Sequence, residues 1–169
     1  MPGTPPLVSR YTLPLVLAGS VLLSAPASAQ SASSPLAQDL AGRLQGAGLD
    51  AIAAKDPQSG RYAAALFLPG VQMLVVSAEY SAPARLDELL ASGNYRDVYV
   101  NLNSGFVPGT RIFIEDRSSD GLREDATPPD AFQNGTGRTV FDGSAADGLL
   151  EEADAEYARI LEILMSVAR

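Results

Sequence analysis

Hydrophobic residues recur at spacings that change along the chain, and these changes predict where its helices and strands lie. A leucine stands at every fourth position from Leu36 to Leu44, which puts one face of a helix in the core. Ser34 and Pro35 suit the first turn, because a hydroxyl caps free N–H groups and proline has none to satisfy. Gly48, just past the last leucine, suits the end of this helix.

Residues 49–80 predict three consecutive strands joined by short turns. Residues 56–60, with the sequence DPQSG, have turn composition, and Pro69-Gly70 marks the second turn. The third strand is apolar on both faces. One face carries Leu74, Val76 and Ala78, and the other carries Met73, Val75 and Ser77. This pattern predicts a central strand covered on two sides, as in a barrel wall backed by helices. Only its end, at Glu79 and Tyr80, is placed to line the mouth of a ligand site.

A short helix is predicted from Pro83, ending near Gly93. Directly after it, apolar residues alternate with more polar ones over residues 95–103, which predicts a fourth strand. The alternating apolar residues are Val98, Val100 and Leu102.

A fifth strand over residues 111–116, a terminal hairpin and a long helix are predicted to complete the domain. The hairpin is expected around Asn134-Gly135, a pair suited to a turn with positive φ. Residues 145–168 predict an amphipathic helix with an acidic first part. Its apolar stripe consists of Leu149, Ala153, Tyr157, Ile160, Leu164 and Val167. The stripe fits packing on the sheet, and the alternative is a contact between two copies in a homodimer.

Residues 1–29 have the layout of a secretory signal peptide. Arg10 precedes an apolar stretch over residues 13–23, and small residues including Ala29 form a cleavage site. We expect cleavage after Ala29, which leaves residues 30–169 as a single soluble domain. The alanine-rich signal is typical of a Gram-negative bacterium, so the expected location is the periplasm, or secretion beyond it.

Composition narrows the function classes. Loss of the signal removes one of the 12 Lys and Arg residues and none of the 20 Asp and Glu residues, which leaves a net charge of −9. An acidic chain of this kind is not expected to bind nucleic acid or an anionic membrane. The chain has no His and no Cys, which excludes Ser-His-Asp and Cys-His catalysis and the usual zinc sites.

One loop has the spacing of calcium ligands. Oxygen-bearing side chains stand at Asp116, Ser118 and Asp120, and Gly121 follows at the sixth position. The twelfth position is Thr127 rather than the glutamate that would close a calcium loop. A calcium-stabilised module using these three residues is one alternative, and an ordinary aspartate-rich turn is the other.

The order of elements resembles the split-barrel fold of the FMN-binding, pyridoxamine-phosphate-oxidase-like proteins. GRYAAALFLPGVQMLVVSAEY looks like the second and third strands of that family, and PARLDELLASGNYRDVYVNL looks like its connecting helix and following strand. The resemblance implies an FMN phosphate near Ser77, Tyr80 and Arg85. The segment departs from the family because Arg85 stands beside Asp87 and Glu88, where flavin-binding members carry several basic residues.

We therefore expect an α+β fold with a small antiparallel split barrel or a strongly twisted sheet. An N-terminal helix, a connecting helix and a long C-terminal helix complete it. The expected function is that of an exported binding or accessory domain without catalytic activity, acting on an unknown small molecule or protein. The alternatives are a flavin-binding oxidoreductase or flavin carrier, with FMN as cofactor, and a calcium-stabilised extracellular module.

Overall fold

A computed structural model describes most of the chain after the predicted signal peptide. The described ranges are 31–70, 72–79, 84–104, 111–135, 137–144 and 148–168, with backbone only at 84 and 85. The predicted signal peptide lies outside these ranges. Within them, no helix combines the length and the apolar character that crossing a membrane requires.

The described residues form four helices and six strands in an α+β arrangement. In chain order the elements are α1 (Ser34–Ala47), β1 (Ala51–Lys55), β2 (Arg61–Leu68), β3 (Gln72–Glu79), α2 (Ala84–Ala91), α3 (Tyr95–Ser104), β4 (Arg111–Asp116), β5 (Asp130–Asn134), β6 (Gly137–Phe141) and α4 (Leu149–Met165). The strands form one antiparallel sheet in the order β1-β2-β3-β4-β5-β6. β1 and β6 are its two edges, so the sheet is open rather than closed.

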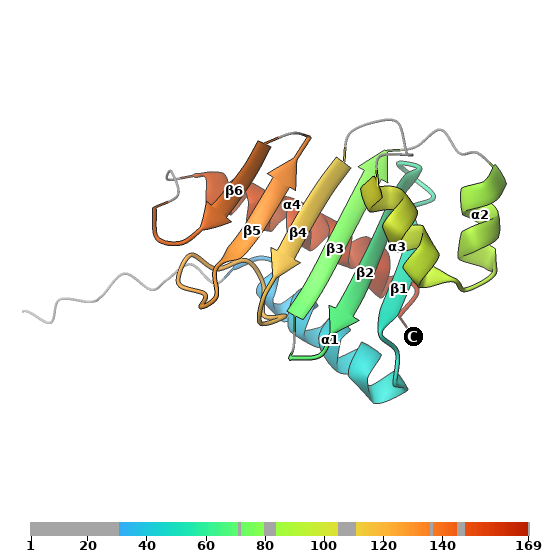
Figure 1. The fold of residues 1–169 in the computed structure, drawn as a ribbon, viewed down its shortest axis with the longest axis horizontal. Coiled ribbons are helices and arrows are strands. Elements are labelled where there is room, and N and C mark those ends of the chain that lie inside the picture. The colour runs from blue at the N-terminus through green and yellow to red at the C-terminus, as the bar shows by residue number, and fades with distance from the viewer. Residues whose placement is uncertain are drawn as a thin grey trace, which may run out of the picture.

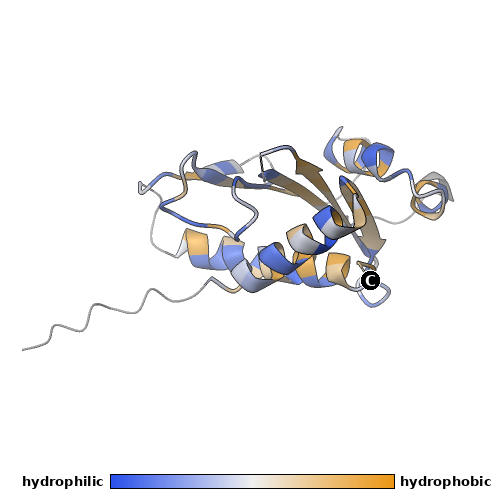
Figure 2. Cartoon of the chain, turned by 90° about the horizontal axis from the view of Figure 1, so that it is seen from below, coloured by the Kyte–Doolittle hydropathy of each residue, from blue (hydrophilic) through white to orange (hydrophobic). Residues whose placement is uncertain are grey.

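Helices cover the two faces of the sheet unequally. α1 and α4 pack side by side on one face, and α3 lies on the other face over β1, β2 and β3 (Figures 1 and 2). The main core fills the α1/α4 side, and a second cluster fills the α3 side. The α3 face of β5 and β6 carries no described helix (Figure 1).

The predicted first helix and three-strand meander are confirmed. Gly48 adopts a left-handed φ of 66° and ends α1, as its position past the last leucine predicts. β3 is covered on both faces, since Met73 and Val75 belong to the main core and Val76 belongs to the second cluster. Only the proposed cap of α1 differs: Ser33, not Ser34, stands at the cap position.

The strand predicted over residues 95–103 is wrong, because these residues form α3. Val98 and Leu102, four residues apart, are both fully buried against the sheet, whereas Val100 is 58% exposed. The pattern resembled a strand only because the exposed Val100 lies midway between Val98 and Leu102, the two residues that face the core from the helix. Asn94 precedes the helix and exchanges hydrogen bonds with Asp97, which is a capping arrangement at the helix start.

α4 packs inside the chain with most of its predicted stripe. Tyr157, Ile160 and Leu164 are fully buried in the main core, so these positions serve packing within one chain rather than a dimer contact. The two ends of the stripe behave differently. Leu149 is 45% exposed and Val167 is 50% exposed.

Candidate functional site

A groove of about 810 Å³ lies between one end of the sheet and the first half of α4. Its position follows from the antiparallel sheet, because β2, β4 and β6 begin at this end while β3 and β5 finish there. The groove is lined by Arg61, Glu79, Ile112, Phe132, Asn134, Gly137, Thr139, Phe141, Leu149, Glu152, Ala153, Ala155, Glu156 and Arg159. Its volume is within the range of about 300–1,000 Å³ typical of small-molecule sites.

A chain of charged groups forms the polar wall of the groove. Arg61 donates through Nη1 to Glu156 on α4, and Arg159 Nη1 donates to the other carboxylate oxygen of Glu156 at 3.0 Å. The Arg61 and Glu156 side chains are 16% and 18% exposed, whereas Arg159 is 69% exposed. Nε of Arg61 is buried and has no hydrogen-bond partner among the described residues. The wall therefore holds a guanidinium with an unused donor.

Apolar side chains form the rest of the lining. Phe141 and Ile112 belong to the main core, and Phe132 is partly buried against it. Leu149 leaves nearly half of its surface exposed at the start of α4. The groove thus offers apolar surface next to charged groups.

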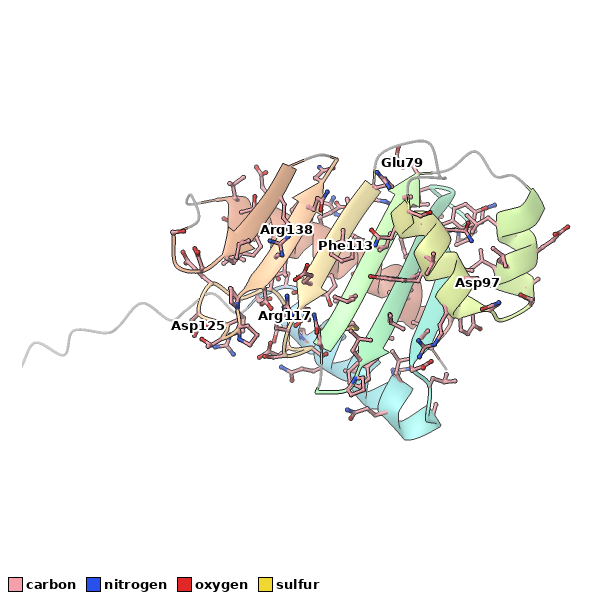
Figure 3. All side chains as sticks on the ribbon, viewed as in Figure 1. Glu79, Asp97, Phe113, Arg117, Asp125 and Arg138 are labelled. Atoms are coloured by element: carbon pink, nitrogen blue, oxygen red, sulfur yellow. The ribbon has the colours of Figure 1, made fainter. Side chains whose placement is uncertain are left out.

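Glu79 lies at the end of β3 (Figure 3) and lines this groove. The sequence places it at the mouth of a ligand site. It stands directly opposite Arg61 in the β2–β3 register. No ion pair joins the two among the described residues. The other predicted mouth residue, Tyr80, lies outside the described residues.

Of the three residues expected from the flavin resemblance, only Ser77 is fully described. The Ser77 side chain is fully buried in the sheet and donates to the backbone oxygen of Tyr62 at 3.0 Å. Tyr80 and the side chain of Arg85 lie outside the described residues. The FMN site therefore stays a prediction.

The residues expected to bind calcium form a closed turn. Asp116 is fully buried and accepts from the backbone N–H groups of Asp120 and Gly121, at 3.2 and 3.0 Å, and from the Tyr157 hydroxyl at 3.0 Å. Ser118 is exposed, and Asp120 pairs with Arg123. In the described part of the chain, no three His, Cys, Asp or Glu side chains are grouped to hold a metal ion. Asp116 already accepts three hydrogen bonds from within the chain, and the calcium site stays a prediction.

Two further aspartates, not singled out by the sequence, fasten neighbouring segments. Asp130 accepts from the backbone N–H groups of Arg117 and Arg123, at 2.7 and 2.9 Å. Asp154 on α4 accepts from the N–H and hydroxyl of Ser33, which precedes α1. Their partners are distant in sequence or lie in an irregular loop, so no periodic pattern marks them.

Burial and neighbouring charges change the titration of this acidic region. Burial raises the pKa of Asp130 from 3.8 to about 7, and the Asp116 and Asp120 carboxylates add to the rise. Two backbone hydrogen bonds oppose this shift without cancelling it. Burial likewise raises the pKa values of Asp116 and Tyr157. These groups lie at the opposite end of β4 and β5 from the groove.

The sheet face that α3 leaves uncovered carries a separate ion network. Glu115 accepts from Arg117 at 2.5 Å and from Arg138 at 3.1 Å. Figure 3 shows Arg117 and Arg138 on this face, near Phe113. Both carboxylate oxygens of Glu115 already accept within the face, and the cavity lined there by Phe113 and Gln133 has a volume of only about 60 Å³, so this face is a weaker site candidate than the groove.

Arg61 was missed by sequence reasoning, although a signal for it exists. It stands in phase with Ala63 and Ala65, which face the main core, so a charged residue at this position faces inward.

Comparisons with family models, with curated proteins and with solved structures found no match to this chain. The site is therefore argued from geometry alone.

Proposed function

We propose that the protein is an exported binding domain without catalytic activity of its own, whose ligand occupies the groove between the sheet and α4. The observation that carries the proposal is the groove itself, which combines a volume of about 810 Å³ with apolar surface and a partly buried guanidinium. Sites for small molecules typically have this composition, with a few polar groups fixing the orientation of an otherwise apolar contact.

Binding is favoured over catalysis by where the titratable groups lie. General acid-base chemistry near neutral pH needs a group whose pKa lies near 7 beside the reacting atoms. Asp130 has such a pKa, but it lies at the far end of β5 from the groove and accepts two backbone hydrogen bonds. The chain contains no His or Cys that could take over the role.

The test is native mass spectrometry of the mature protein purified from the periplasm of its own host. We expect a bound small molecule on the wild-type protein and its loss from Thr139→Trp, because an indole at this position fills the groove. Val140→Trp is the matched control, since Val140 is adjacent on β6 but points to the other face.

Wild-type protein with a bare mass would contradict the proposal. So would a bound mass that Thr139→Trp retains. A bound mass equal to that of a flavin would favour the flavin carrier of split-barrel type instead. The calcium-stabilised module stays a prediction, which a thermal melt with calcium and with chelator tests. A homodimer likewise stays a prediction, which the mass of the protein in solution tests.

A further inference from the structure

Arg61 lines the groove, and one edge of its guanidinium has no hydrogen-bond partner among the described residues. Nη1 is held by Glu156, while Nε and Nη2 make no hydrogen bond to any described residue. These two nitrogens form the side of the guanidinium that binds a carboxylate with two parallel hydrogen bonds. A buried N–H donor without an acceptor is unfavourable, so an anionic ligand group that accepts from it would be stabilised there.

Glu79 provides the opposite charge beside this edge. Residues directly opposite in an antiparallel pair have Cβ atoms about 5 Å apart on the same face. Arg61 and Glu79 are such a pair, both line the groove, and Glu79 forms no hydrogen bond or ion pair with its side chain in the part of the chain that the structure describes. A ligand with one carboxylate and one ammonium group would satisfy both.

The acidic groups around the groove also limit the ligand's charge. Glu79, Glu152 and Glu156 face two arginines, and Arg61 is already shared with Glu156. A ligand with two negative groups would meet more repulsion than attraction, whereas a zwitterion matches the lining.

The apolar lining fixes the rest of the ligand. Leu149 is 45% exposed and lines the groove together with Phe132 and Phe141. Covering this surface removes apolar area from water, which favours a complex. An aromatic or large aliphatic side chain on the ligand would provide that cover.

We infer that the groove binds a zwitterion with an apolar body, either a large apolar amino acid or a short apolar peptide, with its carboxylate on Arg61 and its ammonium group towards Glu79. The inference rests on the proposed function and specifies its ligand. Free amino acid and peptide share this chemistry, and the groove volume admits both.

The test is isothermal titration of the mature protein with four probes. L-phenylalanine and L-phenylalanyl-L-phenylalanine carry both charges, 3-phenylpropionate lacks the ammonium group, and phenethylamine lacks the carboxylate. We expect saturable binding of at least one zwitterion and affinities at least about tenfold weaker for both single-charge probes, equal to about 1.4 kcal/mol. Binding by the amino acid alone or by the dipeptide alone identifies the source.

Two variants locate the binding. Glu79→Gln keeps the shape of an exposed side chain, and Arg61→Met keeps the apolar stem while Glu156 retains Arg159. We expect each to weaken zwitterion binding at least about tenfold. Glu162→Gln on the exposed side of α4 is the control and should bind as the wild type does. Thermal melts establish that each variant is folded.

Absence of binding by all four probes would overturn the inference, as would equal affinity for the single-charge probes or unchanged binding by Glu79→Gln. These results leave the proposed function standing if the purified protein still carries another small molecule that Thr139→Trp loses. A bare protein would overturn both.

Discussion

Buried aspartates hold irregular segments of this protein in place. Asp116, Asp130 and Asp154 each accept backbone N–H groups from a loop or from the segment before α1. Since a loop has few ladder hydrogen bonds of its own, a carboxylate that accepts several N–H groups replaces them. For Asp130 this role comes with a cost, because burial disfavours its charged form.

Stability should therefore decrease as pH rises towards neutrality. The pKa of Asp130 is raised from 3.8 to about 7, so between these values the folded state holds a proton that the unfolded state has released. The free energy of unfolding then falls by up to about 1.4 kcal/mol per pH unit across that window and levels off above it. We expect a higher melting temperature at pH 5 than at pH 8, measured at constant ionic strength.

The Asp130→Asn variant separates the titration of Asp130 from that of the other acidic groups. The variant cannot ionise, so its melting temperature should depend less on pH between 5 and 8, although one loop N–H loses its best acceptor. Burial also raises the pKa of Asp116, so the variant should keep a smaller decrease in stability as pH rises. Wild-type stability that is flat or rises over this range would contradict the account.

Gly121 lies where the loop approaches the start of α1 closely. Its φ is 93°, and a Cβ there would stand 2.7 Å from the backbone of Ser34 and from the Ser33 hydroxyl. We expect Gly121→Ala to lower the free energy of unfolding by about 2–4 kcal/mol, because strain and a clash with α1 add together.

Gly143→Ala is the matched control for that variant. Gly143 has a similar φ of 81°, but nothing lies within 4 Å of the added Cβ. Its cost should be limited to backbone strain, about 1–2 kcal/mol. Equal losses for the two variants, measured by urea denaturation, would show that close approach to α1 is unimportant.

At the scale of elements, α3 shows how a short pattern misleads. Strand and helix both place Val98 and Leu102 on one face, and only Val100 distinguishes them. Asn94 before this segment exchanges hydrogen bonds with Asp97 and is the local signal that favours the helix. The short turn at Gly93-Asn94 joins α2 directly to α3, which suits two successive helices.

Aspartate substitutions at these two valines test the helix directly. Val98 is fully buried and Val100 is 58% exposed. Val98→Asp should lower the free energy of unfolding by about 3 kcal/mol or more, whereas Val100→Asp should change it by no more than about 0.5 kcal/mol. A strand would put both valines on one face, so similar losses in chemical denaturation would contradict the helix.

At the scale of the whole molecule, local sequence patterns predict the helices and strands, whereas contacts between distant residues form the groove. The meander, the terminal hairpin, α1 and α4 follow from periodicity and turn residues, and sequential pairing of the strands follows from their short connections. The groove does not, because it depends on how α4 docks across the sheet. Arg61 and Glu156 are 95 residues apart, and no sequence pattern around either residue indicates that they interact.

The central claim is that the groove between the sheet and α4 binds a ligand. The most direct measurement is a set of ¹H–¹⁵N spectra of residues 30–169 with and without a deproteinised extract of cells of the host organism. We predict that shifted amides cluster at the groove, including Glu79, Thr139 and Glu156. Unchanged spectra, or shifts confined to the opposite sheet face around Phe113 and Arg138, would contradict the claim (Figure 3).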